Sequence, residues 1–328
     1  MLISNKLRSF ISGYTKCNDF EYKPLKKGFS ERNIYRIYSG NYTFIAVESD
    51  NIPENIAFIE FTKSFQKINL RVPDILVVSE DISMYITTDL GEKTLYDFIN
   101  ENINNRSLLL NYYKKSINDL FLFQTSGNKV IDYKFCYQTD SFNYEQILND
   151  ENKFVSYYAQ YLPEYNSVFF QNTFNILNER LTSVDSEYFL YRDFQPRNII
   201  INNDELYYID YQSGRKGPLQ YDLASFLYSG SINLTTDERK ILIDNYLNIL
   251  QSEGIFANNF MEKFNYFVLI RLLQMIGSYA YHITEKKSEI SYFENKIRKV
   301  IKHLREIYYS INEKEIRDMI DKIIFIHI

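Results

Sequence analysis

The sequence contains no tryptophan, two cysteines and three histidines in 328 residues. Cys17 and Cys136 stand far apart and belong to no CxxC motif or His–Cys cluster. This argues against a disulfide framework and a structural zinc site, and it suits a reducing cytoplasm. No apolar run reaches the roughly 18 residues that a membrane-spanning helix needs, and Lys6 and Arg8 interrupt the stretch where a signal peptide has its apolar core. We therefore expect a cytoplasmic protein without a membrane partner.

The chain has no excess of positive charge either. The formal net charge is −5, and no long basic stripe provides the concentrated footprint that nucleic-acid binding requires. Glycine (10) and proline (6) are few, whereas tyrosine (30) and phenylalanine (25) are abundant. We interpret these aromatics first as compositional drift, and as binding-site residues only where a motif agrees. The shares of hydrophobic (45%) and charged (24%) residues are those of a soluble globular protein, and the length accommodates two lobes.

The hydrophobic periodicity changes along the chain. Alternating apolar residues and turn signals predict strands between residues 22 and 47 and at 75–78 and 83–88, with helices at 1–18 and from Pro53 onward. Beyond residue 91, helical periodicity dominates. We therefore predict an α+β fold with a small β-rich lobe at residues 1–90 and a larger helical lobe at residues 91–328. The helices predicted for the larger lobe span 94–125, 142–160, 164–182, 219–230, 235–252, 258–282 and 288–309.

One short segment interrupts this helical pattern. Asp193 and Asn198 lie five positions apart in a polar loop. The next three residues form a predicted strand, residues 202–204 a turn, and residues 206–209 the returning strand. A hairpin with this register brings Asp210 back beside Asn198, so three oxygen-bearing side chains converge at its open end.

The chemistry of these three side chains agrees with that placement. Carboxylate and amide oxygens are ligands that Mg²⁺ prefers. Phosphoryl transfer needs a metal on the phosphates of the donor and a carboxylate that accepts the proton of the attacking hydroxyl. Asn198 and Asp210 suit the metal role, and Asp193 suits the base role. Taken singly, each has a simpler interpretation as a helix cap, a turn residue or a surface carboxylate, but their order and spacing favour a site.

The same segment resembles a known superfamily. Tyr191-Arg192-Asp193-x-x-x-x-Asn198 is similar to the catalytic loop of protein kinases and of the aminoglycoside phosphotransferase/choline kinase superfamily. Ile209-Asp210 resembles the metal-binding aspartate of the following hairpin, and GPLQYDLA at 217–224 resembles the Gly-x-x-x-x-Asp-Leu-Ala element. More narrowly, RDFQPRN and the segments 209–228 and 271–281 look most like bacterial cell-wall amino-sugar kinases. Those enzymes phosphorylate the anomeric hydroxyl of N-acetylmuramate or N-acetylglucosamine.

This resemblance implies a two-lobed, protein-kinase-like fold and an enzyme that uses ATP and Mg²⁺ to phosphorylate a hydroxyl of a small polar molecule, above all an amino sugar. Its partners would be the nucleotide and the acceptor, and we expect a monomer or weak dimer. The resemblance gives catalytic roles to Asp193 and Arg192 and metal binding to Asn198 and Asp210. It gives Asp222 a structural role, bracing the catalytic loop from below.

The nucleotide site departs from the family pattern. Residues 44–48 (FIAVE) lack the lysine that the third strand usually offers to the phosphates, and the loop before Arg32 holds a single glycine instead of a glycine-rich cover. Arg32 or Arg36 is our candidate for the missing positive charge. Asp89 lies where the hinge is expected and is our third candidate for nucleotide binding. Glu54, on the first-lobe helix, has no lysine partner and receives no role.

Five polar residues are candidates for binding the acceptor. Arg197 precedes the candidate metal ligand by one position, and a guanidinium suits polydentate contacts with anions. Gln212 and Arg215 lie just beyond the second candidate metal ligand. Arg271 and Gln274 are polar positions in an otherwise apolar helix, where they either face a cleft or form a buried hydrogen-bonded pair.

Three alternatives stay open. In the first, the acceptor is one that other enzymes of the same superfamily phosphorylate, such as choline, an aminoglycoside or another amino alcohol. Alternatively, the chain is a nucleotide-binding regulatory module without turnover, which the missing lysine and the sparse glycines suggest. The third alternative is a metal-dependent hydrolase that uses the same carboxylates, although no second metal cluster supports it.

Overall fold

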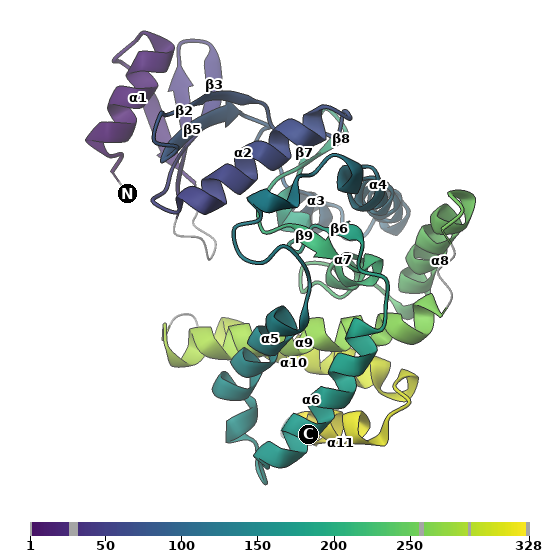
Figure 1. The fold of residues 1–328 in the computed structure, drawn as a ribbon. Helices are drawn as coiled ribbons and strands as arrows, with labels where there is room; N and C mark the ends of the chain where they lie inside the picture. The colour runs from purple at the N-terminus through teal and green to yellow at the C-terminus, as the bar shows by residue number, and fades with distance from the viewer. Residues whose placement is uncertain (1, 26–31, 256–258, 288–289, 326–328) are drawn as a thin grey trace.

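The computed structural model describes residues 2–25, 32–255, 259–287 and 290–325. Its N-terminal lobe is built on a five-stranded antiparallel sheet of order β1-β2-β3-β5-β4, with helices α1 and α2 packed against it (Figure 1). The loop expected to carry the single glycine falls within residues 26–31, outside the described residues. The elements of this lobe are α1 (Asn5–Thr15), β1 (Glu21–Pro24), β2 (Asn33–Ser39), β3 (Tyr42–Glu48), α2 (Ile52–Gln66), β4 (Ile75–Val78) and β5 (Met84–Thr88).

The two faces of the sheet belong to different cores, because successive side chains of a strand point to opposite faces. Met84 and Ile86 of β5 pack with the apolar side of α1 in a small core. Tyr85, between them, belongs to the main core and stacks on Phe58 of α2, with ring centroids 5.1 Å apart. The main core continues from α2 into the larger lobe, so both lobes share one hydrophobic interior.

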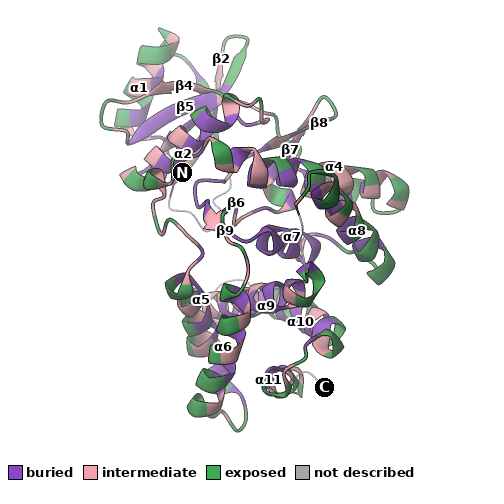
Figure 2. Ribbon diagram, turned by 45° about the vertical axis from the view of Figure 1, so that its right-hand side comes forward, coloured by how far each residue is buried: buried purple, intermediate pink, exposed green. Residues whose placement is uncertain are grey.

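The larger lobe consists of helices around two short antiparallel strand pairs, β6–β9 and β7–β8. Helix α7 is buried along its whole length (Figure 2), and α5, α6, α9, α10 and α11 form the part of the molecule farthest from the sheet (Figure 1). The elements are α3 (Leu95–Glu101), α4 (Arg106–Thr125), α5 (Tyr144–Tyr157), α6 (Ser167–Thr182), β6 (Tyr188–Leu190), β7 (Ile199–Asn202), β8 (Glu205–Tyr208), β9 (Arg215–Gly217), α7 (Leu219–Leu227), α8 (Thr236–Ser252), α9 (Phe260–Thr284), α10 (Ile290–Ile307) and α11 (Lys314–Phe325). Five 3₁₀ turns connect them, at Gly127–Lys129, Tyr133–Phe135, Ala159–Tyr161, Pro196–Asn198 and Tyr308–Ser310.

Two parts of the predicted helical lobe differ from the structure. The single helix predicted over 94–125 is two helices, because α3 ends at Glu101 and the side chain of Asn105 caps a new helix by accepting a hydrogen bond from the Leu108 amide at 3.2 Å. Helix α11 was not predicted, although Ile316, Met319, Ile320 and Ile323 recur at helical spacing and are fully buried.

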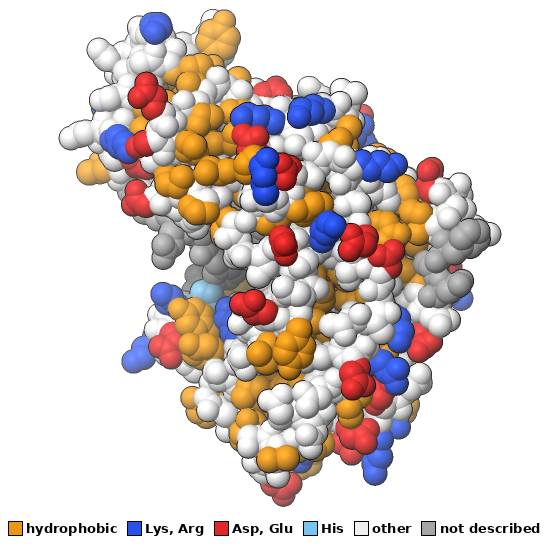
Figure 3. Space-filling view, viewed as in Figure 1, with side chains coloured by type: hydrophobic (Ala, Val, Ile, Leu, Met, Phe, Trp, Pro, Cys, Tyr) orange, Lys and Arg blue, Asp and Glu red, His pale blue; other side chains and the backbone are white. Residues whose placement is uncertain are grey.

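The surface agrees with the composition. Basic and acidic side chains are interspersed on the face shown in Figure 3. Among the described residues, no helix combines the length and the hydrophobicity required to cross a bilayer.

Candidate active site

The β7–β8 hairpin brings two candidate metal ligands together. Ile199 pairs with Tyr208, and one step further the Ile209 amide donates to the Asn198 carbonyl at 3.0 Å. The side-chain nitrogen of Asn198 lies 3.4 Å from a carboxylate oxygen of Asp210 and donates to the Asp193 carbonyl at 2.9 Å. Asn198 therefore lies between the Asp193 backbone carbonyl and the Asp210 carboxylate, and the hairpin register predicts its meeting with Asp210.

The loop that carries Asp193 is held from below by Asp222. The two oxygens of this carboxylate accept the amide hydrogens of Tyr191 at 2.6 Å and Arg192 at 2.8 Å. Burial raises the pKa of Asp222 to about 7, although both hydrogen bonds lower it. The ring of Tyr191 is fully buried, and its hydroxyl donates to the Ile209 carbonyl at 2.7 Å. Tyr191 thus joins the catalytic loop to the residue before Asp210.

Asp193 and Asp210 influence each other electrostatically. Burial raises the pKa of Asp193, and the negative charge of Asp210 raises it further, whereas Arg192 and Arg271 act in the opposite direction. Arg192 and Asp210 have φ angles of 74° and 71°, in the left-handed region that residues other than glycine rarely adopt. Such backbone conformations persist where the surrounding structure fixes them, and they concentrate at functional sites.

Two residues of the N-terminal lobe, Arg32 and Glu54, lie at the Asp210 side of the hairpin. Arg32 donates to Asp210 at 2.6 Å, and its Nε lies 3.4 Å from the Glu54 carboxylate of α2. Gln212 connects the same two carboxylates, at 2.8 Å to Asp210 and 3.2 Å to Glu54. Burial by itself lowers the pKa of Arg32, but Tyr85, Asp210 and Glu54 outweigh it, so the pKa is raised and Arg32 stays charged. Sequence reasoning gave Glu54 no role because its partner is an arginine from before β2, not a lysine on β3.

Arg36 lies elsewhere in the lobe. Its guanidinium binds both oxygens of Asp89, at 2.7 and 2.9 Å, and also contacts Glu92 and the Gly91 carbonyl. Arg36 and Asp89 therefore join β2 to the segment that connects the two lobes, and the structure does not bring either of them to Asp210. Their nucleotide-binding role stays a proposal.

A second group of polar side chains surrounds Arg192. Its guanidinium lies 3.7 Å from Asp150 of α5, and Gln274 donates to the same carboxylate oxygen at 3.0 Å. Arg271 bonds to Gln274 and lies 3.4 Å from the Tyr221 hydroxyl. Asp150 was missed by sequence reasoning, since nothing in the motif indicates which helix packs against the loop.

The two remaining arginine candidates have different environments. Arg215 is 1% exposed and binds Gln146 at 2.7 Å, Gln138 at 2.6 Å and the Ser213 carbonyl at 3.0 Å. Burial, followed by the charge of Arg192, lowers the pKa of Arg215 to about 10. Arg197 is exposed, and its guanidinium stacks on a tyrosine ring of α3, 3.7 Å from the ring centroid.

The donor set fits magnesium that binds together with a nucleotide. Among the described residues, no group of three or more His, Cys, Asp or Glu side chains is placed to hold a metal. One carboxylate and one amide, those of Asp210 and Asn198, are what magnesium typically takes from a protein when phosphates and water complete its shell. The Asp210 side chain keeps 34% of its surface exposed, so it is accessible to such an ion.

Solved structures of kinases resemble most of the chain. No protein-family model and no curated protein sequence matches it. Choline kinase LicA from Streptococcus pneumoniae aligns with a TM-score of 0.63 at 16% identity, covering 91% of this chain and 98% of the other. The Plasmodium vivax ethanolamine kinase aligns with a TM-score of 0.59 at 12% identity, covering 87% and 82%. The ADP-bound aminoglycoside phosphotransferase APH(2'')-Ib aligns with a TM-score of 0.57 at 13% identity, covering 91% and 96%. The chain is therefore similar to these enzymes in fold, and the predicted two-lobed, protein-kinase-like α+β fold is confirmed.

Proposed function

We propose that the chain is a phosphotransferase that uses ATP and Mg²⁺ to phosphorylate a hydroxyl group of a small amino sugar. The observation that carries the proposal is that the Asn198 side chain lies between the Asp193 backbone carbonyl and the Asp210 carboxylate at the open end of one hairpin. The fold similarity to kinases with small acceptors supports it. Such transfer depends mainly on positioning and on neutralising charge, which this arrangement of oxygen ligands and arginines suits.

Asp193 would act as the general base. It accepts the proton of the acceptor hydroxyl as the oxygen attacks the γ-phosphorus, while the bond from that phosphorus to the bridging oxygen of ADP breaks. Its raised pKa makes it a stronger base than an exposed aspartate. Asp222 keeps the loop in place through two backbone amides. Arg192 would fix the base indirectly by its ion pair with Asp150.

Arg32 is our choice for the cation that faces the phosphates. It lies against Asp210, and its pairing with Glu54 of α2 resembles the lysine–glutamate pair of protein kinases in its charges. A guanidinium can bind two phosphate oxygens at once. Magnesium, held with the nucleotide by Asp210 and Asn198, would neutralise the remaining phosphate charge.

The acceptor would lie between Asp193 and the polar group around Asp150. Three buried polar atoms there have no hydrogen-bond partner among the described residues: Asp150 Oδ2, Arg192 NH1 and Arg271 Nε. Unpaired buried polar groups are costly, and a hydroxylated ligand would satisfy them. The guanidinium groups of Arg192 and Arg271 would be unfavourable neighbours for a cationic group, so we propose an amino sugar in preference to choline or an aminoglycoside.

An acceptor panel tests the proposal by ADP release. The purified chain is mixed with ATP and magnesium, and N-acetylglucosamine, N-acetylmuramate, choline, ethanolamine or kanamycin is added. We expect release with at least one amino sugar, clearly above the rate without acceptor. ADP release with choline, ethanolamine or kanamycin alone would show that the acceptor is a cationic amino alcohol or aminoglycoside and not an amino sugar. Nucleotide binding without release for any acceptor would favour the regulatory module.

A further inference from the structure

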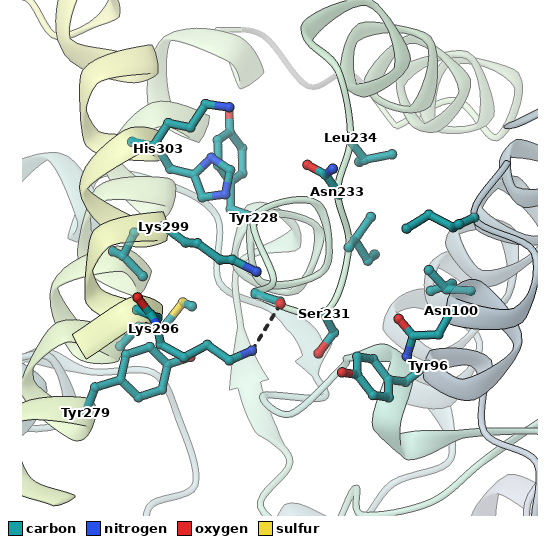
Figure 4. Close-up of a pocket in the computed structure, with 18 of the residues that line it drawn as sticks. Tyr96, Asn100, Tyr228, Ser231, Asn233, Leu234, Tyr279, Lys296, Lys299 and His303 are labelled. Carbon is teal, nitrogen blue, oxygen red and sulfur yellow. Dashed lines mark hydrogen bonds between the residues drawn. The ribbon is translucent and has the colours of Figure 1, made fainter. Parts of the chain in front are cut away.

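A cavity of about 490 Å³ lies beside the candidate catalytic loop, between α3, the segment after α7, and α10. Figure 4 shows Lys296 and Lys299 extending from α10 into this space, with Tyr96 and Asn100 of α3 on the opposite side. Its volume is in the range of small-molecule sites. None of the residues that we place in the phosphoryl-transfer machinery lines it, so the proposed reaction leaves this cavity unexplained.

The charges of the cavity are predominantly positive. Of the described residues that line it, Glu306 alone is acidic, and this carboxylate is already paired with Arg239 at 3.2 Å and His303 at 2.9 Å. Lys296 is half-buried and donates to the Gly230 carbonyl at 3.2 Å. Burial lowers the pKa of Lys296, and the charges of Lys299 and Arg197 lower it further. The charges of Lys299 and Arg197 therefore act on Lys296, while Glu306 is engaged by Arg239 and His303.

One residue of the cavity wall contacts the candidate catalytic loop. Tyr96, which lines it, carries the guanidinium of Arg197 on its ring, and Arg197 belongs to the catalytic loop one position before Asn198. Tyr279 lines it from α9, and the charges of both Arg271 and Arg197 act on its hydroxyl. Arg197 and Tyr96 therefore link the candidate catalytic loop to the wall of the cavity.

We propose that this cavity binds an anionic group of the acceptor, a carboxylate or phosphate on the sugar, through Lys296 and Lys299, with Arg197 on the neighbouring Tyr96 ring. The proposal rests on the proposed function, and it narrows the acceptor to a negatively charged sugar. The aromatic rings of Tyr96 and Tyr279 provide apolar walls for the sugar ring, and the lysines provide the charge-assisted hydrogen bonds. The same charges repel cationic acceptors, so the cavity would favour anionic sugars and also exclude cationic substrates.

The test compares matched neutral and anionic sugars by calorimetry. N-acetylglucosamine is the neutral reference, N-acetylmuramate adds a carboxylate, and N-acetylglucosamine 6-phosphate adds a phosphate. ADP and magnesium are present so that no transfer occurs. We expect at least one anionic sugar to bind about tenfold tighter or more than the neutral one, as expected for hydrogen bonds to a charged group. The anionic sugar that binds more tightly than N-acetylglucosamine shows whether the cavity prefers a carboxylate or a phosphate.

Two variants locate the effect. Lys299→Gln removes an exposed charge and is expected to reduce the anionic-over-neutral affinity ratio several-fold, whereas Lys240→Gln, on α8 outside the cavity lining, keeps the wild-type ratio. Higher salt should weaken the anionic ligand selectively. Equal affinity for neutral and anionic sugars, absence of binding by both anions, or an unchanged ratio in Lys299→Gln overturns the proposal. If anionic sugars bound in a lysine-dependent way but no acceptor caused ADP release, the proposed anion site would stand and the proposed kinase activity would be wrong.

Discussion

At the scale of single residues, Asp193 and Asp210 lie in different surroundings, which suits the different roles that we propose for them. Asp210 accepts hydrogen bonds from Arg32 and Gln212. Burial together with the charge of Asp210 raises the pKa of Asp193, although nearby arginines act in the opposite direction. Pairs of carboxylates whose environments differ in this way are typical of sites where one group holds charge and the other moves a proton.

Asp193→Asn tests the base directly. The amide keeps the size of the side chain but accepts no proton, so kcat should fall by about 10²–10⁴-fold, while the Kd of ATP with magnesium stays within about twofold. In the wild type, kcat/KM should fall as the pH decreases through the raised pKa, because the base must be ionised, and this limb should vanish in the variant. Steady-state rates and calorimetry measure both. A kcat within a factor of a few of the wild type would remove Asp193 from catalysis.

Arg32→Ala tests the replacement for the missing lysine. Loss of the guanidinium should weaken ATP binding about tenfold or more, as expected for charge-assisted contacts to phosphate. Adenosine carries no phosphate and should bind equally to the variant and the wild type, which separates a phosphate contact from a general defect. Calorimetric titration with both ligands gives the answer. Equal losses for ATP and adenosine would indicate a purely structural role.

At the scale of secondary-structure elements, helices α5 and α9, which lie beside the candidate catalytic loop, pack closely against each other. Gly277 of α9 faces the backbone of α5, and an added Cβ would lie 2.8 Å from the Phe154 Cα. Backbone atoms cannot move aside as a flexible side chain can. This contact sets the position of Asp150 on α5 relative to Gln274 on α9, and both bind near Arg192.

Gly277→Ala should therefore destabilise the protein, by about 1–3 kcal/mol or more from overpacking, and lower kcat with it. Gly13→Ala is the matched control, since Gly13 lies on an exposed part of α1 and no atom lies within 4 Å of the added Cβ. There the better helix propensity of alanine should stabilise by up to about 1 kcal/mol. Urea unfolding of both variants provides the comparison. Equal effects of the two changes would argue against the close packing of α5 on α9.

Local sequence signals predicted most of the helices and strands, but they did not predict which elements pack against one another. The hairpin register followed from strand and turn residues alone, so the meeting of Asn198 and Asp210 was predictable. The partners of Arg192 and Arg32, which are Asp150 and Glu54, come from helices distant in sequence, and only tertiary packing brings them to the loop. The cavity was equally inaccessible to prediction, because Lys296 and Lys299 have the spacing of an ordinary solvated helix face.

At the scale of the whole molecule, one buried carboxyl makes stability depend on pH. Glu151 is 1% exposed and has the Asn178 amide 3.4 Å away. Burial raises its pKa from an ordinary value of 4.5 to about 8. A carboxyl with a higher pKa in the folded state binds its proton more tightly there, so folding stability should fall as the pH rises from about 4.5 to about 8.

Glu151→Gln removes that dependence. Above pH 8 the variant should be more stable than the wild type by about 1–3 kcal/mol, because the wild type then buries a poorly compensated charge. At pH 5 the two should be similar. Glu179→Gln, at an exposed position of α6, is the control and should change stability by less than about 0.5 kcal/mol throughout. Urea unfolding between pH 5 and pH 9 measures this, and parallel curves for wild type and Glu151→Gln would contradict the assignment.

The central claim is that the open end of the β7–β8 hairpin holds a divalent cation under a triphosphate. The most direct measurement is calorimetric titration of ATP with magnesium and with EDTA, for the wild type and for Asp210→Asn. We expect magnesium to tighten ATP binding to the wild type about tenfold or more, as expected for a charged ligand contact. In Asp210→Asn the ratio of the two affinities should fall to about one. If Asp210→Asn kept the magnesium dependence of the wild type, the hairpin would not be the metal site and the kinase proposal would lose its basis.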